Sequence, residues 1–179
     1  MNELMGLAGA AEGTGGLSAI ETVADVLERE IQPMIRDWLA RVEREPDLKS
    51  VSLSFEERTG HLPHLLHDVI KRLRLDSGTK APISVAAAEH GDLRREQGYT
   101  VAMAVEESRI LQVTIFTTLQ ENTDDLEFSK LLPDVVIIAD EVDAQLKEQM
   151  LRFMAADAAK FAQGTTADPS TPAPRRTRH

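Results

Sequence analysis

The residues of this sequence best suited to metal or cofactor chemistry are its histidines. The segment "HLPHLLH" places three of them at intervals of three residues: His61, His64 and His67. A fourth, His90, begins the segment "HGDLRREQGYT". Side chains three residues apart are neighbours on a helix, so two of these imidazoles would form half of a divalent metal site, with Glu89 or His90 as a third ligand. A single histidine, His90 or His64, could instead hold haem in a helical protein.

A structural interpretation of the same histidines is favoured over a metal site or a haem site. They flank the leucines of "HLPHLLH" as polar residues at the edge of a buried helix face do, and the HExxH spacing of many zinc enzymes is absent. Aromatic residues that could line a haem pocket are few: one Trp, one Tyr and five Phe. No phosphate-binding glycine loop and no GxSxG turn occurs, so we expect no enzyme and no cofactor. A small-molecule, metal or haem sensor using His61, His64 and His90 is the alternative.

The segment "HGDLRREQGYT" also has the form of a corner between two helices. His90 and Arg94 lie four residues apart and therefore share a helix face. Gly98 permits the left-handed backbone turn that often ends a helix. We expect Arg94 to pair with a carboxylate such as Glu107 in the next helix. Two further residues belong to this corner: Gln97 and Tyr99. Such a corner is structural first, although the same groups could line a ligand pocket or face a partner.

The elements that position these residues are helices. Apolar residues recur every three or four positions over five stretches. These predict helices at about 17–44, 55–73, 83–98, 101–119 and 133–161. The third stretch carries small alanines, which suggest close approach to another helix, and the fourth has the least polar face and is expected to be central and buried. The segment "DVVIIAD" is interpreted as helix because its apolar face continues for several turns.

Prolines and capping residues set the expected ends of these helices. Pro33 would kink or break the first helix, Pro63 would begin or bend the second after a first turn, and Pro133 would begin the last. Three residues are expected to cap helices: Ser54, which forms a capping box with Glu57, and Ser84 and Thr100. The predicted fold class is all-α, either globin-like or an up-and-down bundle of about five helices.

Length and charge narrow the class of protein further. A chain of 179 residues, 42% hydrophobic and 28% charged, suits a single globular domain without cysteine chemistry. A net charge of −10 disfavours binding to nucleic acid and to anionic membranes. No apolar run reaches the roughly 18 to 20 residues that span a bilayer. We expect a cytoplasmic protein with a flexible segment at 1–17, one helical domain at 18–162 and a disordered tail at 163–179.

Three segments together resemble a known family: Trp38 in "IRDWLARV", then "HLPHLLHDVIKRL", then "EHGDLRREQGYTVAMAVEESRILQVTI". They resemble the RsbRD-type N-terminal domain family, which is related to the RsbT co-antagonists of the stressosome. The residues on the family pattern are Trp38, His61, Leu62, Pro63, Leu65, Leu66, His90, Arg94, Gln97, Gly98, Tyr99, Glu107 and Leu111. The resemblance covers about residues 20–155. Ser108 and Gln112 depart from the pattern, which usually has tyrosine and arginine at these positions.

The resemblance implies a non-enzymatic sensory or regulatory input domain of bacterial signal transduction. Such domains are similar to globins that carry no haem, and they dimerise through helices. We therefore expect a homodimer that acts on a protein partner in a stress-response pathway, either alone or as part of a longer protein. Its mechanism would be a shift between two helix packings, with the signature residues as the corner on which the bundle pivots.

Overall fold

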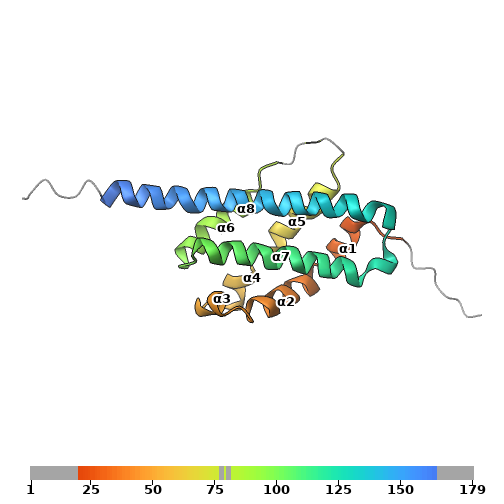
Figure 1. The fold of residues 1–179 in the computed structure, drawn as a ribbon, viewed down its shortest axis with the longest axis horizontal. Coiled ribbons are helices and arrows are strands. Elements are labelled where there is room, and N and C mark those ends of the chain that lie inside the picture. The colour runs from red at the N-terminus through yellow and green to blue at the C-terminus, as the bar shows by residue number, and fades with distance from the viewer. Residues whose placement is uncertain (1–19, 77–78, 80–81, 165–179) are drawn as a thin grey trace, which may run out of the picture.

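The chain folds into a bundle of helices. The computed structural model describes residues 20–76, 79 and 82–164 (Figure 1). Within these ranges every regular element is helical, and the only β-type contact is an isolated bridge between Glu21 and Leu126. The elements are α1 (Val23–Arg29), α2 (Ile31–Val42), α3 (Pro46–Ser50), α4 (Phe55–Thr59), α5 (Leu62–Leu73), α6 (Val85–Glu96), α7 (Val101–Glu121), the 3-10 turn η1 (Thr123–Asp125) and α8 (Phe128–Gly164). The predicted all-α fold class is confirmed.

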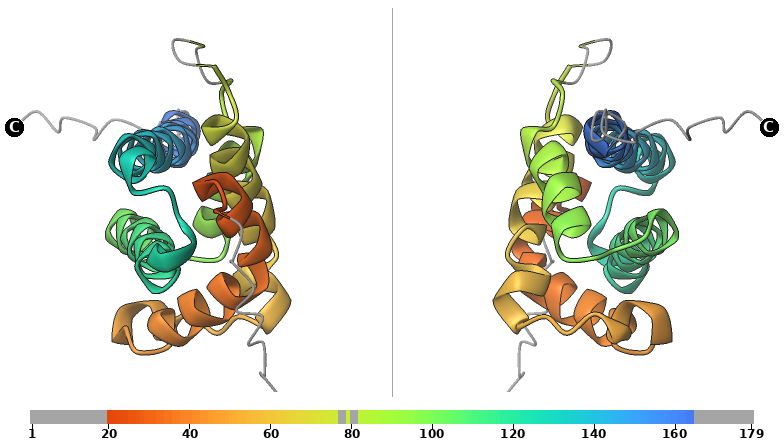
Figure 2. Two further views of the ribbon diagram at one scale, coloured as in Figure 1. Left: turned by 90° about the vertical axis from the view of Figure 1, so that its right-hand side faces the viewer. Right: turned by 90° about the vertical axis from the view of Figure 1, so that its left-hand side faces the viewer.

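The two longest helices, α7 and α8, run antiparallel along the length of the molecule (Figure 1). Viewed end-on, α7 lies between α8 and α2, and α5 and α6 close the remaining side (Figure 2). Helix α6 makes its most extensive contact with α8. Large side chains fill the space between the helices and are almost fully buried, among them Trp38, Leu66, Ile115 and Ile138. The bundle therefore has one continuous core.

Two prolines divide the first two predicted helices, as expected. The stretch predicted at 17–44 breaks at Glu30, and the stretch predicted at 55–73 breaks after Thr59. A proline ring clashes with the carbonyl group four residues before it. Pro33 and Pro63 lie four residues after Arg29 and Thr59, the last residues of α1 and α4. Each proline therefore ends the helix before it and is itself placed in the first turn of the next, where its missing N–H group is not needed.

The last helix is longer than predicted at both ends. Helix α8 begins at Phe128 and contains Pro133 in its second turn, so the prediction that Pro133 begins the helix is wrong. A proline at this depth costs one intrahelical hydrogen bond, which the apolar contacts of a long helix can offset. The helix ends at Gly164, so the first residues of the predicted tail are helical. The segment "DVVIIAD" is helical as predicted. Residues 1–17 and the remainder of the tail lie outside the described residues.

The predicted helix caps are present, but α7 is less buried than predicted. Ser54 forms the capping box with Glu57, and the side chains of Ser84 and Thr100 accept hydrogen bonds at the starts of α6 and α7. Helix α7 is not buried on all sides, because Val101 and Val105 remain 47% and 43% exposed. Among the described helices, none has both the length and the hydropathy needed to cross a membrane.

Candidate functional site

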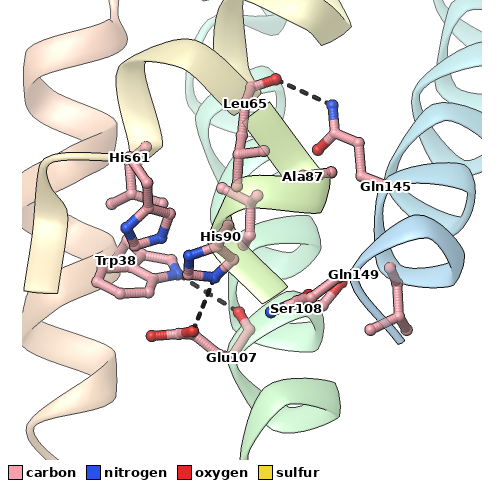
Figure 3. A pocket seen from close by; sticks show the side chains of 12 residues that line it. Trp38, His61, Leu65, Ala87, His90, Glu107, Ser108, Gln145 and Gln149 are labelled. Carbon is pink, nitrogen blue, oxygen red and sulfur yellow. Dashed lines mark hydrogen bonds and ion pairs between the residues drawn. The ribbon is translucent and has the colours of Figure 1, made fainter. Parts of the chain in front are cut away.

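The residues of the sequence signature meet around one buried carboxylate, that of Glu107 in α7. Arg94 and His90 reach it from α6. These three side chains are almost completely enclosed, with exposed fractions of 0% for Arg94, 3% for Glu107 and 5% for His90. Figure 3 shows Trp38, His61 and His90 gathered beside Glu107. We refer to the following residues as the Glu107 cluster: Trp38, His61, His90, Arg94, Tyr99 and Glu107.

Arg94 uses all five of the N–H groups that a guanidinium carries. Its Nε and one Nη2 hydrogen donate to the two carboxylate oxygens of Glu107, each at 2.8 Å, which is the ion pair expected from the sequence. Its Nη1 donates to the side-chain oxygen of Gln97 at 2.7 Å. The remaining two hydrogens go to the main-chain oxygens of Glu57 and Arg58, at 3.0 and 2.8 Å. These carbonyls lie at the end of α4, where they lack helical partners, so Arg94 joins α4, α6 and α7.

The predicted left-handed turn after α6 is present at Gly98, whose φ angle is +87°. The N–H of Gly98 donates to the carbonyl of Arg95 at 3.1 Å, and the N–H of Tyr99 donates to the carbonyl of Arg94 at 3.0 Å. This pair of bonds is a Schellman motif, which ends a helix and satisfies its last carbonyl groups. The turn places the Tyr99 ring 4.9 Å from the guanidinium carbon of Arg94 and lets its hydroxyl donate to Glu107 at 3.2 Å.

Arg58 in α4 belongs to the same network, and sequence reasoning missed it. Its Nη1 donates to the hydroxyl of Tyr99 at 3.0 Å and to the main-chain oxygen of Leu48 at 3.3 Å. Its Nη2 donates to the main-chain oxygen of Val51 at 2.6 Å. The sequence around the capping residue Ser54 is that of an ordinary exposed first turn, so it contains no signal that this arginine is buried. Arg58 ties the chain between α3 and α4 to the corner.

His61 and His90 stack face to face within the cluster. Their ring centroids are 3.7 Å apart and their planes differ by 16°. Trp38 meets His61 edge-on, at 6.0 Å between centroids. The Nε2 atom of His90 lies 3.1 Å from a carboxylate oxygen of Glu107. Because an ionised carboxylate only accepts hydrogen bonds, Nε2 carries the proton and Nδ1 of His90 has the free lone pair.

Burial sets the protonation states of these groups. It lowers the pKa of His61 well below the ordinary value, and the nearby His90 and Arg94 lower it further. Burial also lowers the pKa of His90, which the hydrogen bond to Glu107 only partly offsets. Burial would raise the pKa of Glu107, but the hydrogen bond from His90 and the charge of Arg94 hold it below the ordinary value. Burial and the charge of Glu107 raise the pKa of Tyr99 to about 12. Near neutral pH, both histidines are therefore neutral and Glu107 is ionised.

A cavity of about 20 Å³ lies between the cluster and α8. Gln145 and Gln149 line it from α8, His90 lines it from α6, and His61 lines it from the position just before α5 (Figure 3). Both glutamines are only 4% exposed. Sequence reasoning missed them, although a signal existed: each is a polar residue at a position where the apolar period of α8 places it in the core. Gln145 donates to the main-chain oxygen of Leu65 at 3.1 Å.

Helices α6 and α8 approach each other closely at Gly91. A Cβ atom at this position would lie 2.5 Å from the main-chain oxygen of Gln149, so the contact requires glycine. The predicted close approach of α6 to another helix is confirmed, and Gly91 takes part in it in addition to the alanines that suggested it. This contact places the backbone of α8 one residue from His90, beside the cavity.

The geometry of the two stacked histidines does not suit a metal ion. His61, His90 and Glu107 each offer one ligand atom, and these atoms lie within 4.8 Å of one another. The lone pairs of an imidazole lie in its ring plane, so a single ion cannot lie in the planes of two stacked rings. Both oxygens of Glu107 also accept hydrogen bonds from Arg94, whose positive charge opposes a second cation.

The remaining histidines of "HLPHLLH" do not join the cluster. His64 and His67 are exposed on α5, and neither lines the cavity. His67 Nδ1 is within hydrogen-bond distance of the main-chain oxygen of Pro63. His61, His64 and His90 nevertheless line one open pocket of about 410 Å³ together with Glu89, so the predicted ligand set does meet at one place, although only His61 and His90 belong to the cluster. The cavity of about 20 Å³ between the cluster and α8 is far too small for haem.

Comparisons of the chain with protein-family models, with curated proteins and with solved structures found no match. A function must therefore be inferred from the geometry of the Glu107 cluster and from the sequence signature. Of the residues in that signature, the structure brings six into one buried cluster and places Gln97, Gly98 and Pro63 in the turns that support it.

Proposed function

We propose that this protein is a non-enzymatic sensory or regulatory input domain of bacterial signal transduction. It acts on a protein partner through a change in helix packing, as a cytoplasmic homodimer with a globin-like arrangement of helices, in a pathway of the stress-response type. The resemblance to RsbRD-type domains supports this proposal, because the residues that carry the resemblance are those that build the Glu107 cluster.

The observation that carries the proposal is the direct contact between the Glu107 cluster and α8. Gln145 and Gln149 line the cavity beside His90, and the α8 backbone rests on Gly91. Helix α8 has 37 residues and continues past the ends of α6 and α7 (Figure 1). Because closely packed helices move between discrete arrangements, a change in the cluster would be passed along α8 to its far end.

The chemistry of the cluster supports a role in packing rather than in catalysis. The carboxylate of Glu107 accepts hydrogen bonds from Arg94, His90 and Tyr99, and Arg94 has no N–H group left for a substrate. A general acid or base must reach the substrate proton that it transfers, and these groups face one another inside the core. A buried ion pair with complete hydrogen bonding instead favours one arrangement of the helices that supply it.

A pair of spin labels on α6 and α8 tests this proposal. The sequence contains no cysteine, so Glu96→Cys and Lys147→Cys, both at exposed positions, can be labelled without background. Double electron–electron resonance then gives the distance distribution between the labels, with Glu107 intact and in Glu107→Gln, which weakens the ion pair. We expect a second distance population to appear or to grow in Glu107→Gln, because α8 responds to the state of the cluster.

Two further variants keep the result interpretable. Glu106→Gln changes a neighbouring glutamate that pairs with Arg109 at the surface, and should leave the distance distribution unchanged. Tyr99→Phe removes one hydrogen bond to Glu107 and serves if Glu107→Gln does not fold. A single, unchanged distribution in the folded variants of Glu107 and Tyr99 would overturn the proposal.

A small-molecule sensor is the second candidate function, and the cavity beside His90 is the observation that favours it. The metal form of this alternative does not fit the stacked histidines, and haem does not fit the cavity between the cluster and α8. A ligand there would contact the cluster and α8 at once. Such a sensor would use the same change in helix packing, with the ligand as its signal.

A further inference from the structure

We infer that the cavity between α6 and α8 binds one neutral, water-sized molecule that both donates and accepts hydrogen bonds, and that this molecule links His90 to Gln145 and Gln149. The role of this molecule as a link to α8 rests on the proposed function, whereas its binding does not.

Buried polar atoms without partners surround the cavity. His90 Nδ1, Gln145 Oε1 and Gln149 Nε2 have no hydrogen-bond partner in the described part of the protein, and all three residues line the cavity. Their side chains are at least nine-tenths buried. His61 Nδ1, in the ring stacked on His90, is a fourth such atom. A buried polar atom left unpaired costs about 1–3 kcal/mol, so a bound molecule that pairs several of them is strongly favoured.

The hydrogen-bonding character of each atom defines the ligand. His90 Nδ1 is an acceptor, because Nε2 of the same ring donates to Glu107. Gln145 Oε1 is also an acceptor, because the amide nitrogen of Gln145 donates to the main-chain oxygen of Leu65 and so fixes the orientation of the amide. Gln149 Nε2 is a donor. The ligand must therefore donate twice and accept at least once, as a water molecule does.

Size and charge restrict the ligand to a small neutral molecule. The cavity measures about 20 Å³, and a single water needs about 10–15 Å³ by the same measure. A cation would face the nearby charge of Arg94, and an anion would face Glu107, whose charges already balance each other. Ser108 also borders the cavity, so the departure from the family pattern, which usually has tyrosine here, places a small side chain at its edge.

Nuclear magnetic resonance of the whole chain tests this site with water as the probe. We expect cross-peaks between a long-lived water and the methyl protons of Leu65 and Leu111, which line the cavity. Their signs should be opposite in NOE and ROE spectra, as direct contact requires. Long-range ¹H–¹⁵N spectra should show His90 as the Nε2–H tautomer, with Nδ1 shifted as an accepting nitrogen. A cross-peak from another small molecule with donors and acceptors would equally support the site.

A matched pair of substitutions on α6 identifies the cavity as the source of these signals. Ala87→Val adds two methyl groups at a cavity-lining position and should abolish the water cross-peaks. Ala86→Val makes the same change at the preceding residue, which does not line this cavity, and should leave the water cross-peaks in place. If Ala87→Val does not fold, Gln149→Met removes the donor at nearly constant volume and should weaken the same cross-peaks. The inference is overturned if the unmodified protein shows no bound molecule or if His90 is the Nδ1–H tautomer.

The test of the site is separate from the test of the proposed function. If water is bound but the distances between α6 and α8 are unchanged in the Glu107 and Tyr99 variants, the binding site is supported and the helix-packing function is contradicted. If a second distance population appears in Glu107→Gln but no molecule is bound in the cavity, the function is supported and the binding site is contradicted.

Discussion

At the scale of single residues, Arg94 and Glu107 form a buried ion pair in which all five N–H groups of the guanidinium and both carboxylate oxygens are hydrogen-bonded. Taking an ionic group out of water costs several kcal/mol, and an ion pair alone often does not recover this cost. Here the carbonyl groups of α4 add to the ion pair, because Arg94 donates to the main-chain oxygens of Glu57 and Arg58 as well as to Glu107. The cluster therefore favours one arrangement of its helices, and any other would leave a charge unpaired.

Removing Arg94 should be among the most destabilising single changes in this protein. Arg94→Ala leaves the Glu107 charge buried without its partner, which is expected to lower the free energy of unfolding by about 3–5 kcal/mol. Arg94→Lys keeps the charge but not the planar fork that reaches both carboxylate oxygens, so it should recover only part of the loss. Urea denaturation followed by circular dichroism measures both variants.

Arg109→Ala is the matched control for this prediction. Arg109 forms an ion pair with Glu106, but its side chain is 54% exposed. Exposed pairs of this kind contribute about 0–1 kcal/mol, so the control should remain close to the unmodified protein. Equal stability of Arg94→Ala and Arg109→Ala would show that the buried pair does not hold the corner.

The buried histidines predict that stability falls on acidification. Burial lowers the pKa of His61 and of His90 in the folded protein, whereas in the unfolded chain they titrate near pH 6.5. Below about pH 6.5 the unfolded state therefore binds protons that the folded state does not, and the free energy of unfolding decreases by at most about 1.4 kcal/mol per pH unit for each group. Above that pH their contribution is complete. The lowered pKa of Glu107 acts in the same direction in a more acidic range.

Urea denaturation at a series of pH values from 8 to 5 measures this dependence. His61→Phe keeps an aromatic ring against His90 but removes one titrating group, so its stability should fall less steeply below about pH 6.5. His67→Gln removes an exposed histidine and should leave the slope unchanged. An identical slope in His61→Phe and in the unmodified protein would contradict the assignment of a neutral, buried His61.

At the scale of the elements, local signals could be read from the sequence and long-range contacts could not. Ser54, Ser84 and Thr100 cap their helices through bonds to residues three positions away, so the sequence alone predicts them. The helix breaks were harder to place, because Pro33 and Pro63 act on the carbonyl four residues upstream rather than at their own positions.

The same distinction applies to the candidate site. The pairing of Arg94 with Glu107 could be predicted because the two residues belong to consecutive helices joined by a recognisable turn. The stack of His61 on His90 depends on how α5 packs against α6. The position of Gln149 depends on α8, which lies far along the chain. No local pattern contains these arrangements, which follow from the packing of the whole bundle.

The contact between α6 and α8 predicts a selective effect of substituting Gly91. Gly91→Ala places a methyl group against the main-chain oxygen of Gln149, so α8 must move away from α6. Crowding of this kind typically costs about 1–3 kcal/mol. We expect hydrogen exchange to increase in the part of α8 around Gln149 more than elsewhere.

Gly98→Ala provides the comparison for this prediction. Open space surrounds Gly98, so an added methyl group meets no atom within 4 Å, but its φ of +87° disfavours any other residue. This conformation costs about 1–2 kcal/mol without crowding α8. Both variants should therefore be destabilised to a similar extent, but only Gly91→Ala should show exchange concentrated in α8. Uniformly faster exchange in Gly91→Ala would mean that α8 is not specifically displaced.

At the scale of the whole molecule, the first half of α8 presents apolar residues that the bundle does not cover. Phe128, Leu132 and Val136 follow one another at intervals of four residues and are 79%, 72% and 62% exposed. This spacing places them along one side of the helix. Apolar stripes on a surface commonly mark a protein–protein contact. In the proposed homodimer, a two-fold contact through this stripe would bring the same residues of both copies together, so each substitution there acts twice.

Native mass spectrometry and sedimentation velocity test this contact. We expect a dimer for the unmodified protein and a shift towards monomer for Leu132→Glu, because two glutamates would then face each other across an apolar contact. A loss of about 1.4 kcal/mol or more would raise the dissociation constant at least tenfold. Leu151→Glu introduces the same charge at a position on α8 that is 54% exposed but lies outside the stripe, and should leave the dimer intact. A monomeric unmodified protein would remove the homodimer from the proposed function. A dimer that dissociates in Leu151→Glu but not in Leu132→Glu would instead place the contact in the second half of α8, next to the helix end that is proposed to carry the signal.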